Sequence, residues 1–219
     1  MTWDLIWSSL GPILLGAVRA TIPLALASFV LGLIIALLVA LMRLSRNPVV
    51  SGIGRFYISI IRGTPLLVQL FVIFYGLPSI GLKLEPWPSA IIALSLNVGG
   101  YAAEVIRAAI LSVPKGQWEA GHMIGMSRSL TLRRIILPQA ARVSLPPLSN
   151  TFISLVKDTS LASLILVTEL FREAQQIASV DGEFMTLYLE AAVVYWLICL
   201  VLSTIQSALE KRLDRYVAH

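Results

Sequence analysis

The chain has 219 residues, of which 57% are hydrophobic and only 13% are charged. Soluble domains carry about 25% charged residues, so this composition excludes an ordinary soluble enzyme, a disordered chain and a basic nucleic-acid-binding protein. It is typical of an integral membrane protein. A spanning helix needs about 20 residues, so we expect about five or six spans and no large catalytic domain outside the membrane. The single cysteine, Cys199, excludes an internal disulfide.

The stretches without charged residues predict one all-α, polytopic membrane domain, residues 1–219, with five transmembrane helices. An odd number of spans places the two termini on opposite sides of the membrane. The predicted spans are 13–42, 56–79, 87–112, 143–168 and 188–210, and a long connection, 113–142, follows the third.

Basic residues predict the orientation, because cytoplasmic connections carry an excess of Lys and Arg. Most of the 17 basic residues fall after the first span, in the connection 113–142 and in the C-terminal tail, whereas the opposite side is mainly acidic. We therefore expect the N-terminus outside and the C-terminus in the cytoplasm. The basic residues behind this expectation are Arg43, Arg46, Arg55, Arg62, Lys115, Arg128, Arg133, Arg134, Arg142, Lys211, Arg212 and Arg215.

The second span opens with Arg62, Thr64 and Pro65. Pro65 cannot donate a backbone hydrogen bond, so we expect a kink there that leaves carbonyl groups free. Gln69 lies about one turn beyond Pro65 and is a candidate substrate ligand. Arg62 has two open interpretations, a ligand or gate for a carboxylate and an anchor at the membrane interface.

The third span contains Asn97 in its middle, next to Gly99 and Gly100. The two glycines permit a close helix approach, and Asn97 is either a link between helices or a substrate ligand. Glu104 and Arg107 lie three residues apart near the cytoplasmic end. We interpret them as a structural or gating ion pair.

The connection 113–142 is long for a helix connection and is expected to be functional. Gly125 is placed to end one short helix, Ser127 to cap the next, and Pro138 to mark a boundary or kink. The pattern predicts two short helices outside the membrane. From the residues alone, docking to a partner and binding to anionic lipid through the arginines remain equally open.

The fourth span carries Lys157 and Asp158 about halfway along its length, followed by Thr159 and Ser160. A charged residue inside the membrane costs several kcal/mol and marks a functional site by default. Asp158 is an acceptor for a cationic group of a ligand, and the nearby hydroxyls are donors for an anionic group. The alternative is a structural pair, with Lys157 reaching the interface or another helix and Asp158 capping a broken helix.

The segment 169–183 is polar and acidic and is predicted on the outer side, as a short helix or a solvated linker. His122 is interpreted as a surface residue. No group of His, Asp and Glu has the spacing of a metal site, and no catalytic residues are expected.

Several of these residues resemble one family. Glu119, Ala120 and Gly121, followed by Gly125 and then by Ile135, Leu137 and Pro138, match the EAA loop of ABC-importer permeases, except that Gly121 replaces the usual Ala. The runs Arg62-Gly63-Thr64-Pro65, Tyr101 to Arg107, Val113 to Gln117, and Lys157 to Leu161 are similar to the polar amino acid branch of that family. The likeness covers nearly the whole chain, and within this branch it extends to permeases that import L-cystine in enteric bacteria.

The resemblance implies an ABC type I importer permease in the bacterial inner membrane, which imports a polar amino acid, with L-cystine as the expected substrate. It implies three partners in addition to membrane lipid: a cytoplasmic ABC ATPase dimer, a second permease subunit, with a homodimer favoured, and a periplasmic amino-acid-binding protein. The chain lacks the phosphate-binding sequence G-x-x-x-x-G-K-[ST], so ATP and Mg are expected on the ATPase, and no nucleic acid is expected as a partner.

Under this resemblance the candidate residues form two sites. The ATPase-coupling residues are Glu119, Ala120, Gly121, Gly125, Leu137 and Pro138, and the substrate-binding residues are Arg62, Gln69, Asn97, Lys157, Asp158, Thr159 and Ser160. One alternative function is an ion-coupled carrier or channel that uses Lys157 and Asp158 as a charge relay. Another is a membrane scaffold without transport activity.

Overall fold

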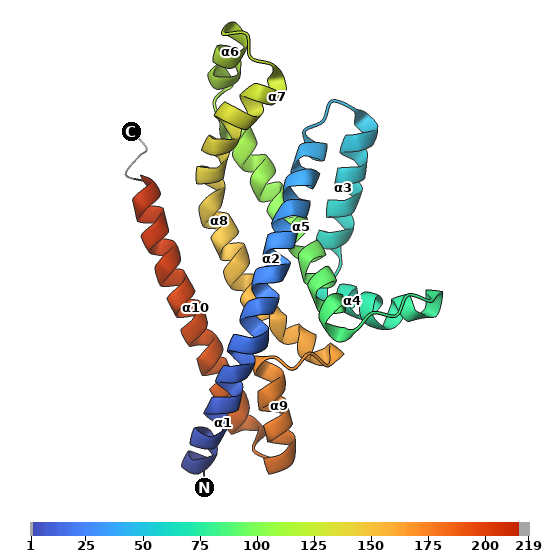
Figure 1. The fold of residues 1–219 in the computed structure, drawn as a ribbon, viewed down its shortest axis with the longest axis vertical. Coiled ribbons are helices and arrows are strands. Elements are labelled where there is room, and N and C mark those ends of the chain that lie inside the picture. Colours follow the sequence, from blue (N-terminus) through green and yellow to red (C-terminus); the bar gives the residue numbers. More distant parts are fainter. Residues whose placement is uncertain (1, 215–219) are drawn as a thin grey trace.

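The computed structural model describes residues 2–214, so Arg215 of the predicted basic tail lies outside the described residues. Every regular element in that part of the chain is helical, which confirms the predicted all-α fold. The helices form an elongated molecule, with the first turn of α1 and the last turn of α10 toward opposite ends (Figure 1). The α-helices are α1 Thr2–Gly16, α2 Ile22–Arg43, α3 Pro48–Gly63, α4 Leu66–Phe71, α5 Pro86–Ser112, α6 Lys115–Met123, α7 Arg128–Thr131, α8 Leu137–Asp158, α9 Leu170–Asp181 and α10 Phe184–Asp214.

Within the described part of the chain, three helices are long and apolar enough to cross a membrane: Trp3–Arg43, Pro86–Ser112 and Phe184–Arg212. Two bent pairs bring the number to five if each pair counts as one span. The first helix is longer than the predicted span 13–42, because α1 and α2 join through a π-helical turn, Ala17–Thr21, into one 41-residue rod. At 1.5 Å per residue the rod is about 60 Å long, about twice the thickness of the hydrocarbon core.

The second predicted span, 56–79, is broken rather than continuous. Helix α3 ends at Gly63, and the segment Leu66–Ile80, which starts with α4, leaves it at 104°. Thr64 is extended, with φ −123° and ψ 146°, because the ring of Pro65 excludes a helical residue before it. The predicted kink is confirmed, and it is close to a right angle.

The fourth predicted span, 143–168, is also interrupted. Helix α8 ends at Asp158, a 3-10 helix follows at Thr159–Ile165, and Leu166 has φ +70°. The rod Arg128–Ile165 then meets α9 at 47°. Leu166 has a large side chain in the left-handed region, so the chain is strained at the point where it turns.

The main core lies where α2, α5 and α8 pack together, around small buried residues such as Ala36, Ala93 and Ala102. A Cβ atom added to Gly99 would lie 2.6 Å from Cγ2 of Ile35, and one on Gly100 would lie 2.5 Å from Cγ2 of Ile61. The predicted role of this glycine pair in close helix approach is therefore confirmed. A second, separate cluster joins α1, α9 and α10.

The connection 113–142 contains two short helices, as predicted, but only the first stands alone. Helix α6 ends at Met123, Gly125 has φ +77°, and the Ser127 side chain caps α7 by accepting a hydrogen bond from the Leu130 amide. Helix α7 continues through a π-helical turn, Leu132–Ile136, into α8, so the chain does not break at Pro138. Pro138 closely follows the π-helical turn, where the regular α-helical hydrogen-bond pattern is already interrupted, so its missing amide donor does not break the helix.

Candidate functional site

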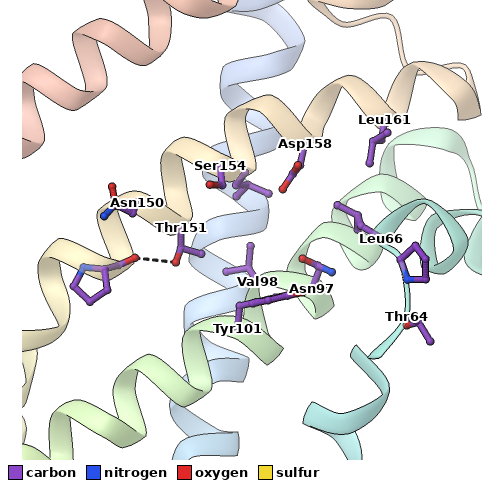
Figure 2. Close-up of a pocket in the computed structure, with 13 residues that line it drawn as sticks. Thr64, Leu66, Asn97, Val98, Tyr101, Asn150, Thr151, Ser154, Asp158 and Leu161 are labelled. Carbon is purple, nitrogen blue, oxygen red and sulfur yellow. Dashed lines mark hydrogen bonds between the residues drawn. The ribbon is translucent and has the colours of Figure 1, made fainter. Parts of the chain in front are cut away.

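A cavity of about 460 Å³ lies between α8, α5 and the break that joins α3 to α4 (Figure 2). Asp158 supplies the one charged side chain among the described residues that line it. Asn150, Thr151 and Ser154 precede Asp158 along α8 and share its face, because residues four apart on a helix lie one above the other. The full lining is Thr64, Pro65, Leu66, Asn97, Val98, Tyr101, Pro147, Asn150, Thr151, Ser154, Leu155, Asp158 and Leu161.

The side chain of Gln69 stabilises the helix break at Pro65. Its side-chain amide donates to the carbonyl of Ile61 at 2.8 Å, to the carbonyl of Thr64 at 3.1 Å and to the Thr64 hydroxyl at 2.9 Å. Its oxygen accepts a hydrogen bond from the side chain of Asn97 at 3.2 Å. Gln69 thus satisfies the carbonyl groups that Pro65 leaves free, and it fixes Asn97 at the wall of the cavity. Gln69 itself is not among the lining residues.

Arg62 lies at the edge of this region rather than in the lining. Its side chain is exposed, and the guanidinium carbon lies 5.4 Å from the ring centroid of Tyr101, which lines the cavity. This distance is within the range of a cation–π interaction. Arg62 therefore lies at the rim of the cavity. Both predicted roles remain open there, a ligand or gate for a carboxylate and an anchor at the membrane interface.

The four-residue cluster 157–160 is divided by the structure. Asp158 lines the cavity, whereas Lys157 is exposed and lies outside the lining. The Thr159 hydroxyl donates to the Val156 carbonyl at 2.8 Å, and the Ser160 hydroxyl donates to the Lys157 carbonyl at 2.7 Å. These two hydroxyls bond their own helix end and do not line the cavity, so the structure brings together only Asp158 and Asn97 of the predicted substrate ligands.

The sequence interpretation missed most of the polar lining. Asn150, Thr151, Ser154 and Tyr101 line the cavity but were not among the predicted ligands. The signal was present, since Asn150, Ser154 and Asp158 follow a four-residue spacing that places polar groups on one face of the helix.

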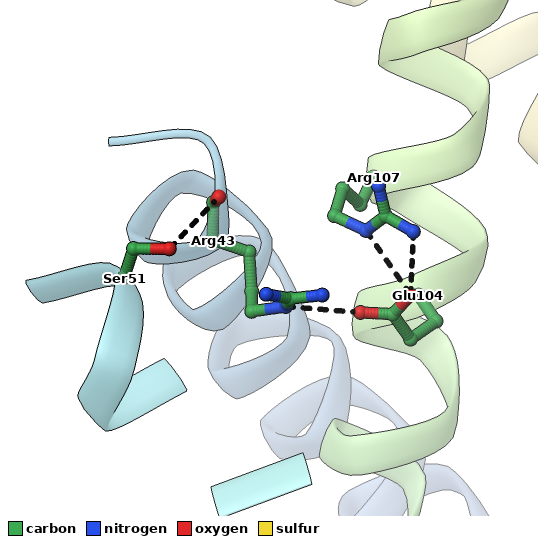
Figure 3. A network of polar contacts seen from close by, with 4 residues as sticks. All are labelled: Arg43, Ser51, Glu104 and Arg107. Carbon is green, nitrogen blue, oxygen red and sulfur yellow. Dashed lines mark hydrogen bonds and ion pairs between the residues drawn. The ribbon is translucent and has the colours of Figure 1, made fainter. Parts of the chain in front are cut away.

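The predicted ion pair of Glu104 and Arg107 is present and includes a third residue (Figure 3). Arg107 contacts one carboxylate oxygen of Glu104 at 2.7 Å, and Nε of Arg43 lies 3.3 Å from the other. The Ser51 hydroxyl donates to the Arg43 carbonyl at 3.4 Å. The cluster ties α2, α3 and α5 together, and its role as a gate or a purely structural contact stays a prediction.

The connection 113–142 offers an exposed surface on α6. Trp118, Glu119, His122 and Met123 line a shallow groove, and Met123 is 85% exposed. Gly121 points the other way and is buried. A Cβ atom there would lie 2.6 Å from Cγ2 of Thr131, so the glycine in place of Ala lets α6 pack against α7.

The remaining candidates of this loop differ in exposure. Ala120, Gly125 and Pro138 are exposed, and Leu137 is half-buried where α8 begins.

The family described as binding-protein-dependent transport system inner membrane component matches residues 28–215. The chain is 59% identical over 217 residues to the L-cystine transport system permease protein TcyB of Bacillus subtilis (strain 168), across 99% of this chain and 93% of that protein. It is 38% identical over 213 residues to the glutamine transport system permease protein GlnP of Escherichia coli (strain K12), across 96% and 97%. A crystal structure of an amino acid ABC transporter with histidines is similar with a TM-score of 0.86 and 35% identity, over 92% of this chain and 94% of that chain.

The chain therefore belongs to the family of binding-protein-dependent transport system inner membrane components. It has the fold of an ABC type I importer permease and is a multi-pass inner-membrane transport component, with the ATPase on a separate subunit. The predicted family and fold are confirmed.

Proposed function

We propose that this permease moves L-cystine from the periplasm to the cytoplasm by alternating access. The substrate is supported by the 59% identity to an L-cystine permease. A periplasmic N-terminus and a cytoplasmic C-terminus are supported by the basic residues near the ends of α2 and α10 and in the connection 113–142.

The observation that carries the proposed substrate site is the position of Asp158, the single charge among the described residues that line a cavity otherwise made of neutral groups. A carboxylate in such surroundings has a strong need for a cationic partner, and the ammonium group of an amino acid supplies one. Asn97, fixed by Gln69, and the amide and hydroxyl groups of Asn150 and Ser154 supply donors for a substrate carboxylate.

The remaining lining of the cavity also suits L-cystine. Val98, Leu155 and Leu161 form apolar wall next to Asp158, which matches the disulfide and methylene groups in the middle of the molecule. Arg62 at the rim adds a cation for a carboxylate that enters or leaves. Lys157 lies outside the lining, which argues against a charge relay through Lys157 and Asp158.

The proposed coupling site is the exposed face of α6. A short helix that carries Glu119 outward and rests on Thr131 through Gly121 transmits force as a rigid body, and α7 passes that force directly into α8. Because α8 carries Asp158, closure of the ATPases would act on the helix that holds the substrate ligand. The proposed assembly is two copies of this permease, an ATPase dimer that binds ATP and Mg, and a periplasmic binding protein.

The substrate site is tested with Asp158→Asn, which keeps the shape of the side chain and removes its charge. Uptake of radiolabelled L-cystine is measured in cells that lack other cystine transporters and express the complete importer. We expect the uptake rate to fall at least about tenfold, because a charge-assisted hydrogen bond contributes about 1.5–3 kcal/mol.

The matched control is Asp181→Asn, the same change at an exposed residue at the end of α9, which should keep the native rate. Native uptake by Asp158→Asn, at equal amounts of assembled importer, would show that the cavity is not the substrate site.

A further inference from the structure

Glu169 is a fully buried carboxylate that the proposed transport site does not use. Its Oε1 atom accepts a hydrogen bond from the Arg172 amide at 2.8 Å. Its Oε2 atom accepts from the Phe171 amide at 3.0 Å, from the Tyr195 hydroxyl at 2.7 Å and from the Thr21 hydroxyl at 3.4 Å. Four donors therefore converge on one side chain.

The donors come from three separate parts of the fold. Thr21 ends the π-helical turn between α1 and α2, Tyr195 lies on α10, and the two amides belong to the first turn of α9. The approach of α1 is close, since a Cβ atom on Gly16 would lie 3.1 Å from the carbonyl carbon of Glu169. The Thr21 hydroxyl also accepts a hydrogen bond from the Leu170 amide at 3.2 Å. We call Thr21, Glu169 and Tyr195 the Glu169 junction.

This junction is linked to the chain segment that follows Asp158. Arg172, in the capped turn of α9, donates from Nη1 to the carbonyl of Ser163 at 3.0 Å. Ser163 lies in the 3-10 helix Thr159–Ile165, which begins directly after Asp158 and contributes Leu161 to the cavity. The junction thus connects the second cluster, formed by α1, α9 and α10, to the end of α8.

A simple helix cap does not need this arrangement. Ser, Thr, Asp or Asn caps a helix with a shorter side chain, and burying a carboxylate costs free energy that only a complete set of donors offsets. The carboxylate at 169 reaches two hydroxyls on other elements that a short cap would not reach. It therefore fixes the position of the α9 start relative to α1 and α10, in addition to capping α9.

We propose that Glu169 is a positioning residue for substrate binding: its junction with Thr21 and Tyr195 sets, through Arg172 and the 3-10 helix, where Asp158 and Leu161 lie in the cavity. This inference rests on the proposed substrate site at Asp158. It assigns Glu169 no direct contact with substrate.

The test uses Glu169→Gln, which keeps the size of the side chain but turns one acceptor into a donor. Binding of radiolabelled L-cystine is measured on the purified permease–ATPase complex without the binding protein, together with its thermal unfolding. The expected result is a Kd about tenfold higher while the complex still assembles. A displaced Asp158 would lose one charge-assisted hydrogen bond to the substrate, and a change of about tenfold matches that loss. The matched control is Glu183→Gln, at an exposed acid just before α10, which should bind with the native Kd.

Tyr195→Phe is the milder variant in case Glu169→Gln fails to assemble, since it removes only one donor. It is expected to raise the Kd about threefold with an assembled complex. The double variant Glu169→Gln/Asp158→Asn should weaken binding by less than the product of the two single effects, because part of the effect of Glu169 acts through Asp158.

Two results separate this inference from the proposed function. If Asp158→Asn weakens binding while the assembled Glu169→Gln and Tyr195→Phe complexes bind with the native Kd, Glu169 is only a structural cap and the positioning role is overturned. If Asp158→Asn itself binds with the native Kd, the substrate site is wrong.

Discussion

The two broken helices both line one cavity, but different chemistry breaks each of them. The break between α3 and α4 depends on Pro65, which removes a backbone donor, and on Gln69, which satisfies the freed carbonyl groups. The break after α8 has no proline. There the hydroxyls of Thr159 and Ser160 bond the helix end, and Leu166 turns the chain with φ +70°. Each break brings a polar group to the cavity, Asn97 through Gln69 at the first and Asp158 at the second.

The comparison explains why the two breaks depend on different interactions for their stability. At the first break, one side chain satisfies backbone groups that the local sequence leaves free. At the second, the hydroxyls of Thr159 and Ser160 bond carbonyls of their own turns, Arg172 bonds the Ser163 carbonyl, and strain falls on Leu166. Loss of Gln69 should therefore damage the first break far more than loss of a local hydroxyl damages the second, and the following predictions test that difference.

The largest effect is expected for Gln69→Leu. The carbonyls of Ile61 and Thr64 would lose their donor, and Asn97 would lose its partner. The bonds to Ile61 and Asn97 are part-buried, and a buried polar group without a partner costs about 1–3 kcal/mol, so the thermal unfolding midpoint and the rate of L-cystine uptake should both fall. Gln176→Leu, at an exposed position on α9, is the matched control and should change neither. Equal behaviour of the two variants would mean that Gln69 does not support the break.

A smaller effect of opposite sign is expected for Leu166→Gly. A large residue in the left-handed region costs about 1–2 kcal/mol, and glycine removes that strain at an entropic cost of about 0.5–1 kcal/mol. The Leu166 side chain is 57% exposed, so little packing is lost. The purified complex should become slightly more stable to heat. A lower unfolding midpoint would show that the strain at this turn is not relieved by glycine.

The smallest effect is expected for Ser160→Ala. The hydroxyl bonds only the Lys157 carbonyl of its own helix end and lies outside the cavity lining. Such a bond to a neighbouring turn adds little stability, so L-cystine uptake should stay within about twofold of native. A loss comparable to that of Asp158→Asn would restore Ser160 as a substrate ligand.

The sequence predicted the first break more fully than the second for a physical reason. The effect of proline on the backbone is local, so Pro65 alone is enough to predict a kink. The end of α8 at Asp158 depends on contacts made elsewhere in the fold, including Arg172 with the Ser163 carbonyl, which no local pattern contains. For the same reason the sequence predicts the segment 169–183 only as a helix or a linker, although it forms α9 and supplies the Glu169 junction.

The candidate site shows the same difference between features set by the local sequence and features set by contacts elsewhere in the fold. Asp158 and Asn97 were predicted, because a polar group within an apolar span is visible in the sequence. Thr159 and Ser160 do not line the cavity, because their hydroxyls bond backbone carbonyls, and their role as substrate ligands stays a prediction. Arg43 joined the pair of Glu104 and Arg107 only through packing of α2 against α5, which spacing within α5 does not reveal.

The central claim is that Asp158 binds the substrate ammonium group, and the most direct test compares L-cystine with 3,3′-dithiodipropionate, the same disulfide diacid without its ammonium groups. Affinities of both are measured on the purified permease–ATPase complex without the binding protein. The native complex should prefer L-cystine by at least about tenfold, and Asp158→Asn should reduce that preference to about one. An unchanged preference in Asp158→Asn would contradict the claim.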